Sequence, residues 1–170
     1  MYISKIRIKN FRLLKDSLLL LDEEKKQDLS LLIGRNNSGK TSFIMLFDKF
    51  YRSENYKFNY DDFSLSLRDK ILKIDKDTDI AEFSIHLILE IKYTKTESLE
   101  NISDFILDLD PSIDTVKILF DCSINKEKLL KDLATTKNKE KFIQKNLGDY
   151  LDRKIYIFDD DENLKPENKH

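Results

Sequence analysis

Eight consecutive residues, 34–41, have the types and the spacing of a phosphate-binding loop. Gly34 and Gly39 enclose four residues, and Lys40 and Thr41 follow directly. Glycine lets the chain turn sharply and lets backbone N–H groups approach phosphate oxygens without a side-chain clash. A lysine ammonium adds positive charge beside the β- and γ-phosphates, and a threonine hydroxyl is a ligand for Mg²⁺. The spacing therefore predicts a binding site for a purine nucleoside triphosphate, namely ATP bound together with magnesium.

The segments on both sides of this loop predict a strand before it and a helix after it. Residues 30–33 are a short apolar run, typical of a buried strand, and residues 40–52 carry a broad apolar face at helical spacing. This context matches the Walker A motif in full, and two of the three glycines of the chain lie in the motif. The predicted nucleotide contacts in the loop and helix are Gly34, Asn36, Asn37, Ser38, Gly39, Lys40, Thr41 and Ser42, with Thr41 as the magnesium ligand.

The remaining segments alternate between strand and helix patterns. Strands are expected at 2–9, 17–21, 82–94, 116–124 and 154–158, and helices at 64–74 and 126–151, the latter interrupted at Thr135 and Thr136. The strands around 82–124 are expected to pair as an antiparallel meander. The order predicts an α/β fold: one lobe, 1–170, with a P-loop core at 1–52, a mixed sheet and an antiparallel β subdomain at about 82–124.

Composition excludes several classes of protein. The aromatic content of 11% argues against disorder, and the net charge of −2 gives no overall basic footprint for nucleic acid. The apolar runs are too short to span a membrane. The single cysteine, Cys122, lies in an apolar run and cannot form a disulfide within the chain, which fits a reducing compartment. We expect a cytoplasmic protein without a membrane partner.

The first 50 residues resemble the start of an ABC-type ATPase head. The segments IRIKNFRLLKD (6–16) and LIGRNNSGKTS (32–42) are similar to the RecF, SMC and OLD group. The Asn-Asn-Ser-Gly-Lys form most resembles OLD-family ATP-dependent endonucleases and the AAA ATPases of phage-defence systems. The resemblance implies an ABC-type head that binds ATP and Mg²⁺. It also implies that Arg12 approaches the phosphates or the base; a solvated arginine after an edge strand is the alternative.

The sequence also departs from that family. It contains no Ser-Gly-Gly signature, and neither His86 nor His170 is a persuasive switch histidine. An apolar run reaches Asp159 and Asp160, but an acidic surface turn is favoured over a Walker B strand. No catalytic residue is assigned. We expect hydrolysis to need a signature motif from a second ATPase head or from a downstream or partner chain, and nucleic acid is a partner by family analogy only.

Two other functions stay open. The chain could be a complete small P-loop NTPase or kinase that uses Asp159 or Asp160 as its Walker B acid, or an interaction module with a vestigial nucleotide site. Two further patterns are expected to be structural. The lysine-rich helix at 126–145 also carries acids, which favours a solvated face. The aromatic residues below the loop's helix are expected to pack rather than bind a base: Tyr51, Tyr56, Phe58, Tyr60 and Phe63.

Overall fold

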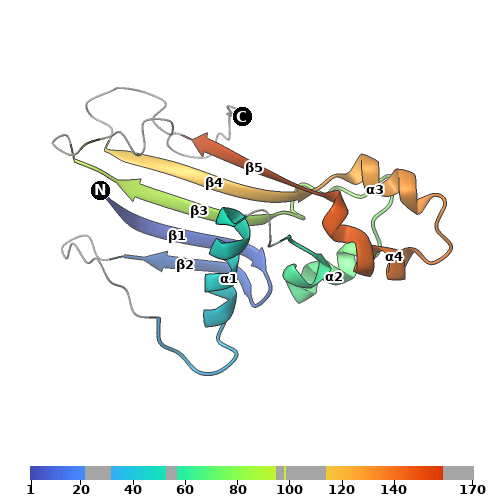
Figure 1. Cartoon of the computed structure of the whole chain (residues 1–170), viewed down its shortest axis with the longest axis horizontal. Coiled ribbons are helices and arrows are strands. Elements are labelled where there is room, and N and C mark those ends of the chain that lie inside the picture. Colours follow the sequence, from blue (N-terminus) through green and yellow to red (C-terminus); the bar gives the residue numbers. More distant parts are fainter. Residues whose placement is uncertain (22–31, 53–56, 95–97, 99–113, 159–170) are drawn as a thin grey trace.

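The computed structural model describes residues 1–21, 32–52, 57–94, 98 and 114–158 (Figure 1). Within these ranges one five-stranded sheet has the order β2-β1-β3-β4-β5. Every neighbouring pair is antiparallel. The strands are β1 (Tyr2–Phe11), β2 (Leu14–Leu20), β3 (Ile85–Lys92), β4 (Thr115–Ile124) and β5 (Leu151–Phe158). The strands expected at 82–94 and 116–124 thus pair as predicted. The division into a P-loop core and a β subdomain stays a prediction.

Helix α1 lies across one face of the sheet, and the shorter helices gather at the end where β4 ends and β5 begins (Figure 1). The helices are α1 (Lys40–Tyr51), α2 (Leu65–Ile71), α3 (Lys126–Leu133) and α4 (Lys139–Asn146), with 3-10 turns η1 (Tyr60–Asp62) and η3 (Leu147–Tyr150). Helix α1 begins at Lys40, where the loop motif predicts a helix. No helix in the described part of the chain is long and apolar enough to cross a membrane.

The predicted strand ahead of the loop is not formed in its described part. Leu32 and Ile33 lie outside every strand, and they are 43% and 80% exposed. Residues 30 and 31 lie outside the described residues. A strand is stable only when a neighbour pairs with its N–H and C=O groups, and no described strand pairs with Leu32 or Ile33. The prediction of a mixed sheet is therefore wrong for the described strands, because they keep only antiparallel pairs.

The core lies between α1 and the sheet face that the alternation of β3 predicts. Leu87 and Leu89 are buried on this face beside their β4 partners Phe120 and Ile118. Helix α1 adds Leu46, which is fully buried. Ile44 belongs to the apolar face predicted for this helix, but its side chain is exposed. It lies two residues before Leu46, about 200° around the helix, and so points away from the sheet.

Cys122 is completely buried in β4, as its apolar surroundings predict. Burial raises the pKa of its thiol, and the neighbouring Asp121 carboxylate raises it further. The thiolate needed by a nucleophile is thereby disfavoured. Cys122 is a packing residue of the core.

The opposite sheet face holds polar contacts between neighbouring strands. Lys5 on β1 pairs with Glu90 on β3 at 3.2 Å. On the same face, His86 Nε2 of β3 lies 3.0 Å from Asp121 Oδ1 of β4. Opposite charges on neighbouring strands contribute modestly to register. His86 is engaged in this ladder, on the polar side of its strand.

The expected break in the 126–151 helix is confirmed and has a local cause. The hydroxyls of Thr135 and Thr136 both donate to the carbonyl oxygen of Asp132, at 3.0 and 2.9 Å. Such side-chain bonds compete with the backbone bonds that would continue α3. Asn138 then caps α4 by accepting from the N–H of Lys141. The charged segment is therefore two short helices.

A hydrogen bond from Tyr150 to Asp132 predicts a pH-dependent contribution to stability. The O–H donates to Oδ2 at 2.6 Å, and this bond raises the pKa of Tyr150 to about 12, above its ordinary value of 10.0. The bond's stabilisation is therefore fully present below about pH 10 and lost as pH rises to about 12. We expect Tyr150→Phe to lower the free energy of unfolding by about 1 kcal/mol near neutral pH.

Urea denaturation of wild type and variant measures this effect. The difference between the two proteins should shrink from about pH 10 upward, as the linkage requires. Tyr156→Phe on β5 is the matched control and should show no such trend. A Tyr150→Phe difference that stays constant through this range would contradict the assignment.

Candidate functional site

The predicted phosphate loop curls around the ammonium group of its own lysine. Lys40 Nζ donates to the carbonyl oxygens of Gly34 and Arg35 at 2.5 and 2.6 Å. It also lies 3.3 Å from Ser38 Oγ. The N–H of Ser38 donates to the Arg35 carbonyl at 3.3 Å and closes the turn. Residues 34–40 thus form a tight loop with a positive charge on its inner side.

The two glycines of the motif differ in what the geometry requires, and only Gly39 has a positive φ. Gly39 has a φ of 93°, and a Cβ there would lie 2.8 Å from Leu14 Cδ2 on β2. A Cβ on Gly34 would lie 2.7 Å from Ser38 Oγ. Asn37 also adopts the left-handed region, with a φ of 63°. Any larger residue at position 39 would strain the backbone and push the loop away from β2.

The start of α1 offers backbone donors to an anion. The first N–H groups of a helix lack acceptors within that helix. Here Gly39 is the N-cap and provides no side-chain cap, and the first turn contains no acidic residue. Thr41 is exposed and Ser42 is buried, while Asn36 and Asn37 are exposed in the loop. These donors, with the dipole of α1 and the Lys40 ammonium, fit the phosphates of a nucleotide.

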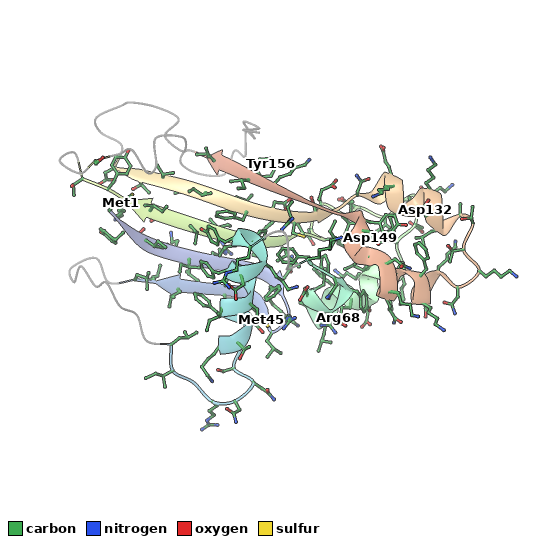
Figure 2. The ribbon with its side chains drawn as sticks, in the orientation of Figure 1. Met1, Met45, Arg68, Asp132, Asp149 and Tyr156 are labelled. Atoms are coloured by element: carbon green, nitrogen blue, oxygen red, sulfur yellow. The ribbon has the colours of Figure 1, made fainter. Side chains whose placement is uncertain are left out.

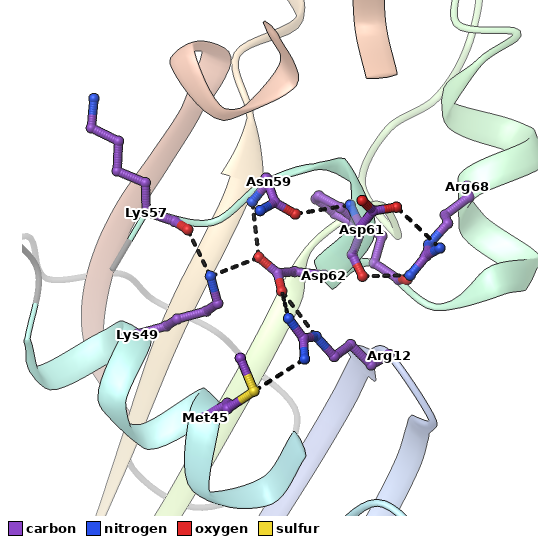
Figure 3. A network of polar contacts seen from close by, with 9 residues as sticks. Arg12, Met45, Lys49, Lys57, Asn59, Asp61, Asp62 and Arg68 are labelled. Atoms are coloured by element: carbon purple, nitrogen blue, oxygen red, sulfur yellow. Dashed lines mark hydrogen bonds and ion pairs between the residues drawn. The ribbon is translucent and has the colours of Figure 1, made fainter. Parts of the chain in front are cut away.

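Arg12, the predicted contact outside the loop, belongs to a buried ion cluster (Figure 3). Its Nε and Nη2 donate to Asp62 Oδ1 at 3.0 and 2.8 Å. Lys49 from α1 lies 2.9 Å from the other carboxylate oxygen, Oδ2. Asp62 is completely buried, and Lys49 is 5% exposed. The structure therefore shows a paired Arg12, in place of the solvated arginine considered from the sequence.

The backbone around Arg12 is strained and is held in place. Asn10 and Arg12 have φ values of 64° and 50°. Each such conformation costs about 1–3 kcal/mol in a residue other than glycine. The Asn10 side chain donates to the carbonyl oxygens of Glu82 and Ser84, and the N–H of Arg12 donates to the Asp62 carbonyl at 2.9 Å. These bonds fix the turn between β1 and β2, and strained backbone of this kind is concentrated at functional sites.

The β1–β2 turn lies directly against the phosphate loop and its helix. Gly39 packs on Leu13 and Leu14, the two residues that follow Arg12. Arg12 Nη1 lies 3.1 Å from Sδ of Met45, and Figure 2 places Met45 on α1 where the helix crosses the sheet. Met45 is four residues after Thr41, so the two occupy one side of α1, a single turn apart. The predicted contact of Arg12 with the nucleotide stays a prediction.

Sequence reasoning missed Asp62 and Lys49 as a pair. One signal for Asp62 was available: Asn59 and Asp62 form a capping box around η1, in which each side chain accepts from the other residue's N–H. That spacing predicts a helical turn at 60–62 rather than loop. Nothing local to Lys49 indicates burial, because its partner lies 13 positions further along the chain.

The expected packing of the aromatic residues near α1 is confirmed for Phe58, Tyr60 and Phe63, whereas Tyr51 is 59% exposed. Phe58 contacts Phe50 and Phe11, with ring centroids 4.9 and 6.3 Å apart. Tyr60 and Phe63 are buried as well. Tyr56 lies outside the described residues. These contacts pack the C-terminal end of α1, which is the end away from the phosphate loop.

Two acidic candidates, Asp159 and Asp160, lie outside the described residues. The strand that leads to them, β5, is at the sheet edge opposite β2. Within the described ranges no three His, Cys, Asp or Glu side chains are gathered as a metal-binding group.

A cavity of about 280 Å³ opens between the loop and the β1–β2 face of the sheet. Leu14, Leu19, Phe43 and Ile33 form part of its apolar lining. Large apolar side chains are exposed in the β1–β2 turn, the loop and the first turns of α1: Leu13, Leu32, Ile33 and Ile44.

The family comparison matches the whole chain. The AAA ATPase domain family covers residues 1–170. The chain belongs to this family. An AAA ATPase domain has an ATP-binding, ATPase-type function, in agreement with the glycine-lysine loop at the start of α1. The comparison with curated proteins found no match to this chain.

The Asp62 cluster predicts a large loss of stability when its carboxylate is neutralised. Asp62→Asn leaves Lys49 and Arg12 without a countercharge, and Lys49 is nearly inaccessible to water. Removing one partner of a buried ion pair costs about 3–5 kcal/mol. We expect a fall of that size in the free energy of unfolding, measured by urea denaturation.

Asp61→Asn is the matched control for this substitution. Asp61 is the adjacent carboxylate, exposed, and pairs with Arg68 at 3.3 Å on the surface. The control should lose less than about 1 kcal/mol. Equal losses for the two variants would show that burial of Asp62 has no energetic consequence.

Proposed function

We propose that this AAA ATPase domain binds Mg-ATP through the loop at 34–42. The observation that carries the proposal is the Lys40 ammonium inside a glycine-closed loop, at the start of a helix that has no acidic residue in its first turn. In this proposal the backbone N–H groups of Gly39 and Lys40 hold phosphate oxygens, and Ser38, Asn36 and Asn37 line the loop. Ser42 contacts the α-phosphate from the first turn of α1.

Thr41 is the proposed magnesium ligand. Its hydroxyl is part of an exposed residue at the second position of α1, beside Lys40. A hard cation such as Mg²⁺ prefers oxygen ligands and keeps several waters. Bound between the β- and γ-phosphates, it would neutralise charge that develops during phosphoryl transfer.

We further propose that the chain is the N-terminal part of an OLD-like, ABC-type ATPase in the cytoplasm. Family membership and the resemblance of residues 6–16 and 32–42 support this finer assignment. A role in a DNA-processing or phage-defence endonuclease, with nucleic acid as a partner, rests on analogy with that group.

Hydrolysis in this proposal needs a further segment with the signature motif, from a second ATPase head or a downstream or partner chain. The apolar residues exposed beside the loop support such a contact. Leu32 and Ile33 adjoin Gly34 directly and are exposed. A segment that covers them would be held next to the nucleotide.

The Lys40→Ala variant tests nucleotide binding. The substitution removes the ammonium together with its bonds to the Gly34 and Arg35 carbonyls, so it should weaken Mg-ATP affinity by about tenfold or more, as loss of a charge-assisted hydrogen bond predicts. Isothermal titration of both proteins measures the change. Lys141→Ala, an exposed lysine of α4, is the control and should bind like wild type. Equal affinity of wild type and Lys40→Ala would end the proposal.

Phosphate release tests the need for a further segment. The purified chain should bind Mg-ATP with little turnover, and turnover should rise when a segment with the signature motif is supplied. Steady release by the chain alone, lost in Asp159→Asn, would instead identify a self-sufficient small NTPase.

A further inference from the structure

We infer that Asp62 is a positioning residue of the nucleotide site, whose carboxylate holds the Arg12 guanidinium beside α1 where it can reach the phosphates. The inference rests on the proposed Mg-ATP site and adds a residue that neither the loop motif nor the family resemblance indicates. It assigns separate tasks to the two cations that share Asp62: Arg12 faces the nucleotide, and Lys49 balances the buried charge.

Asp62 fixes Arg12 through both its side chain and its backbone. One carboxylate oxygen accepts two hydrogen bonds from the guanidinium, and the Asp62 carbonyl accepts the N–H of Arg12. Next to these bonds, the N–H of Ser64 donates to the Asn10 carbonyl, and Phe11 bridges to Phe63. The segment at 62–64 therefore holds the strained end of β1 through an isolated antiparallel bridge.

The held guanidinium lies on the side of α1 that carries the proposed magnesium ligand. Arg12 touches Met45, one helical turn from Thr41. An arginine has five N–H donors. Asp62 takes two of them, and the third contact is to the Met45 sulfur, a weak acceptor. The group is 30% exposed, so it keeps donors for a phosphate oxygen.

Lys49 is placed differently. It lies two turns further along α1 than Thr41, it is nearly fully buried, and it donates to the Lys57 carbonyl as well as pairing with Asp62. Its charge compensates the second carboxylate oxygen inside the protein. Replacing Asp62 and Lys49 together by neutral residues therefore removes the buried charge imbalance but leaves Arg12 without its anchor.

This difference separates a positioning role from a merely structural one. The experiment compares Asp62→Asn, the double variant Asp62→Asn with Lys49→Met, Arg12→Ala and Arg12→Gln, each by thermal denaturation and by titration with Mg-ATP. The double variant should regain most of the thermal stability that Asp62→Asn loses. Its Mg-ATP affinity should stay about tenfold below wild type, as in Arg12→Ala, because both lose the anchored charge. Adding Arg12→Ala to the double variant should cause no further loss.

Several outcomes would overturn the inference. If the double variant folds and binds Mg-ATP as tightly as wild type, Asp62 is a structural residue only. Unchanged affinity in Arg12→Ala and Arg12→Gln, which keep the Asp62–Lys49 pair, would remove the nucleotide contact even if every Asp62 variant failed to fold. Lys40→Ala distinguishes the two levels: if it loses affinity while the Arg12 variants do not, this inference is wrong and the proposed function stands. Asp61→Asn should match wild type in both measurements.

Discussion

A carboxylate without access to water, shared by two cations, is the interaction on which the packing of α1 against the sheet depends. Asp62 connects three segments that are distant in the sequence: the end of β1, the middle of α1 and the turn η1. Each ion needs the others, because an isolated charge in this position would be strongly destabilising. The cluster therefore fixes how α1 lies on the sheet, and α1 carries the loop at its first residue.

A second constraint is the close approach of the loop to β2. Only a residue without a Cβ can have the φ of Gly39 and still lie against Leu14. The hairpin of β1 and β2 is thus in contact with the loop on one side and, through Arg12, with α1 on the other. Hairpin, loop and helix form one packed unit whose geometry is set by a glycine and a buried ion cluster.

Local patterns in the sequence predicted what local forces determine. The alternation in β3, the start of α1 at Lys40 and the break at Thr135 each follow from neighbouring residues, and the structure agrees with them. Leu32 and Ile33 differ, because a strand also needs a pairing partner that an apolar run cannot reveal. The Asp62–Arg12–Lys49 cluster escaped prediction for a similar reason: its members are ordinary charged residues until the fold brings them together and excludes water.

Helix α1 connects the two edges of the sheet. Its first residues meet Leu14 on β2, while at its other end Phe50 packs on Phe120 of β4 and the carbonyl of Lys49 accepts from Arg153 of β5. A helix of 12 residues is a stiff rod about 18 Å long. A shift of the phosphate loop along that axis would therefore move Phe50 and Lys49 against β4 and β5 at the far edge of the sheet.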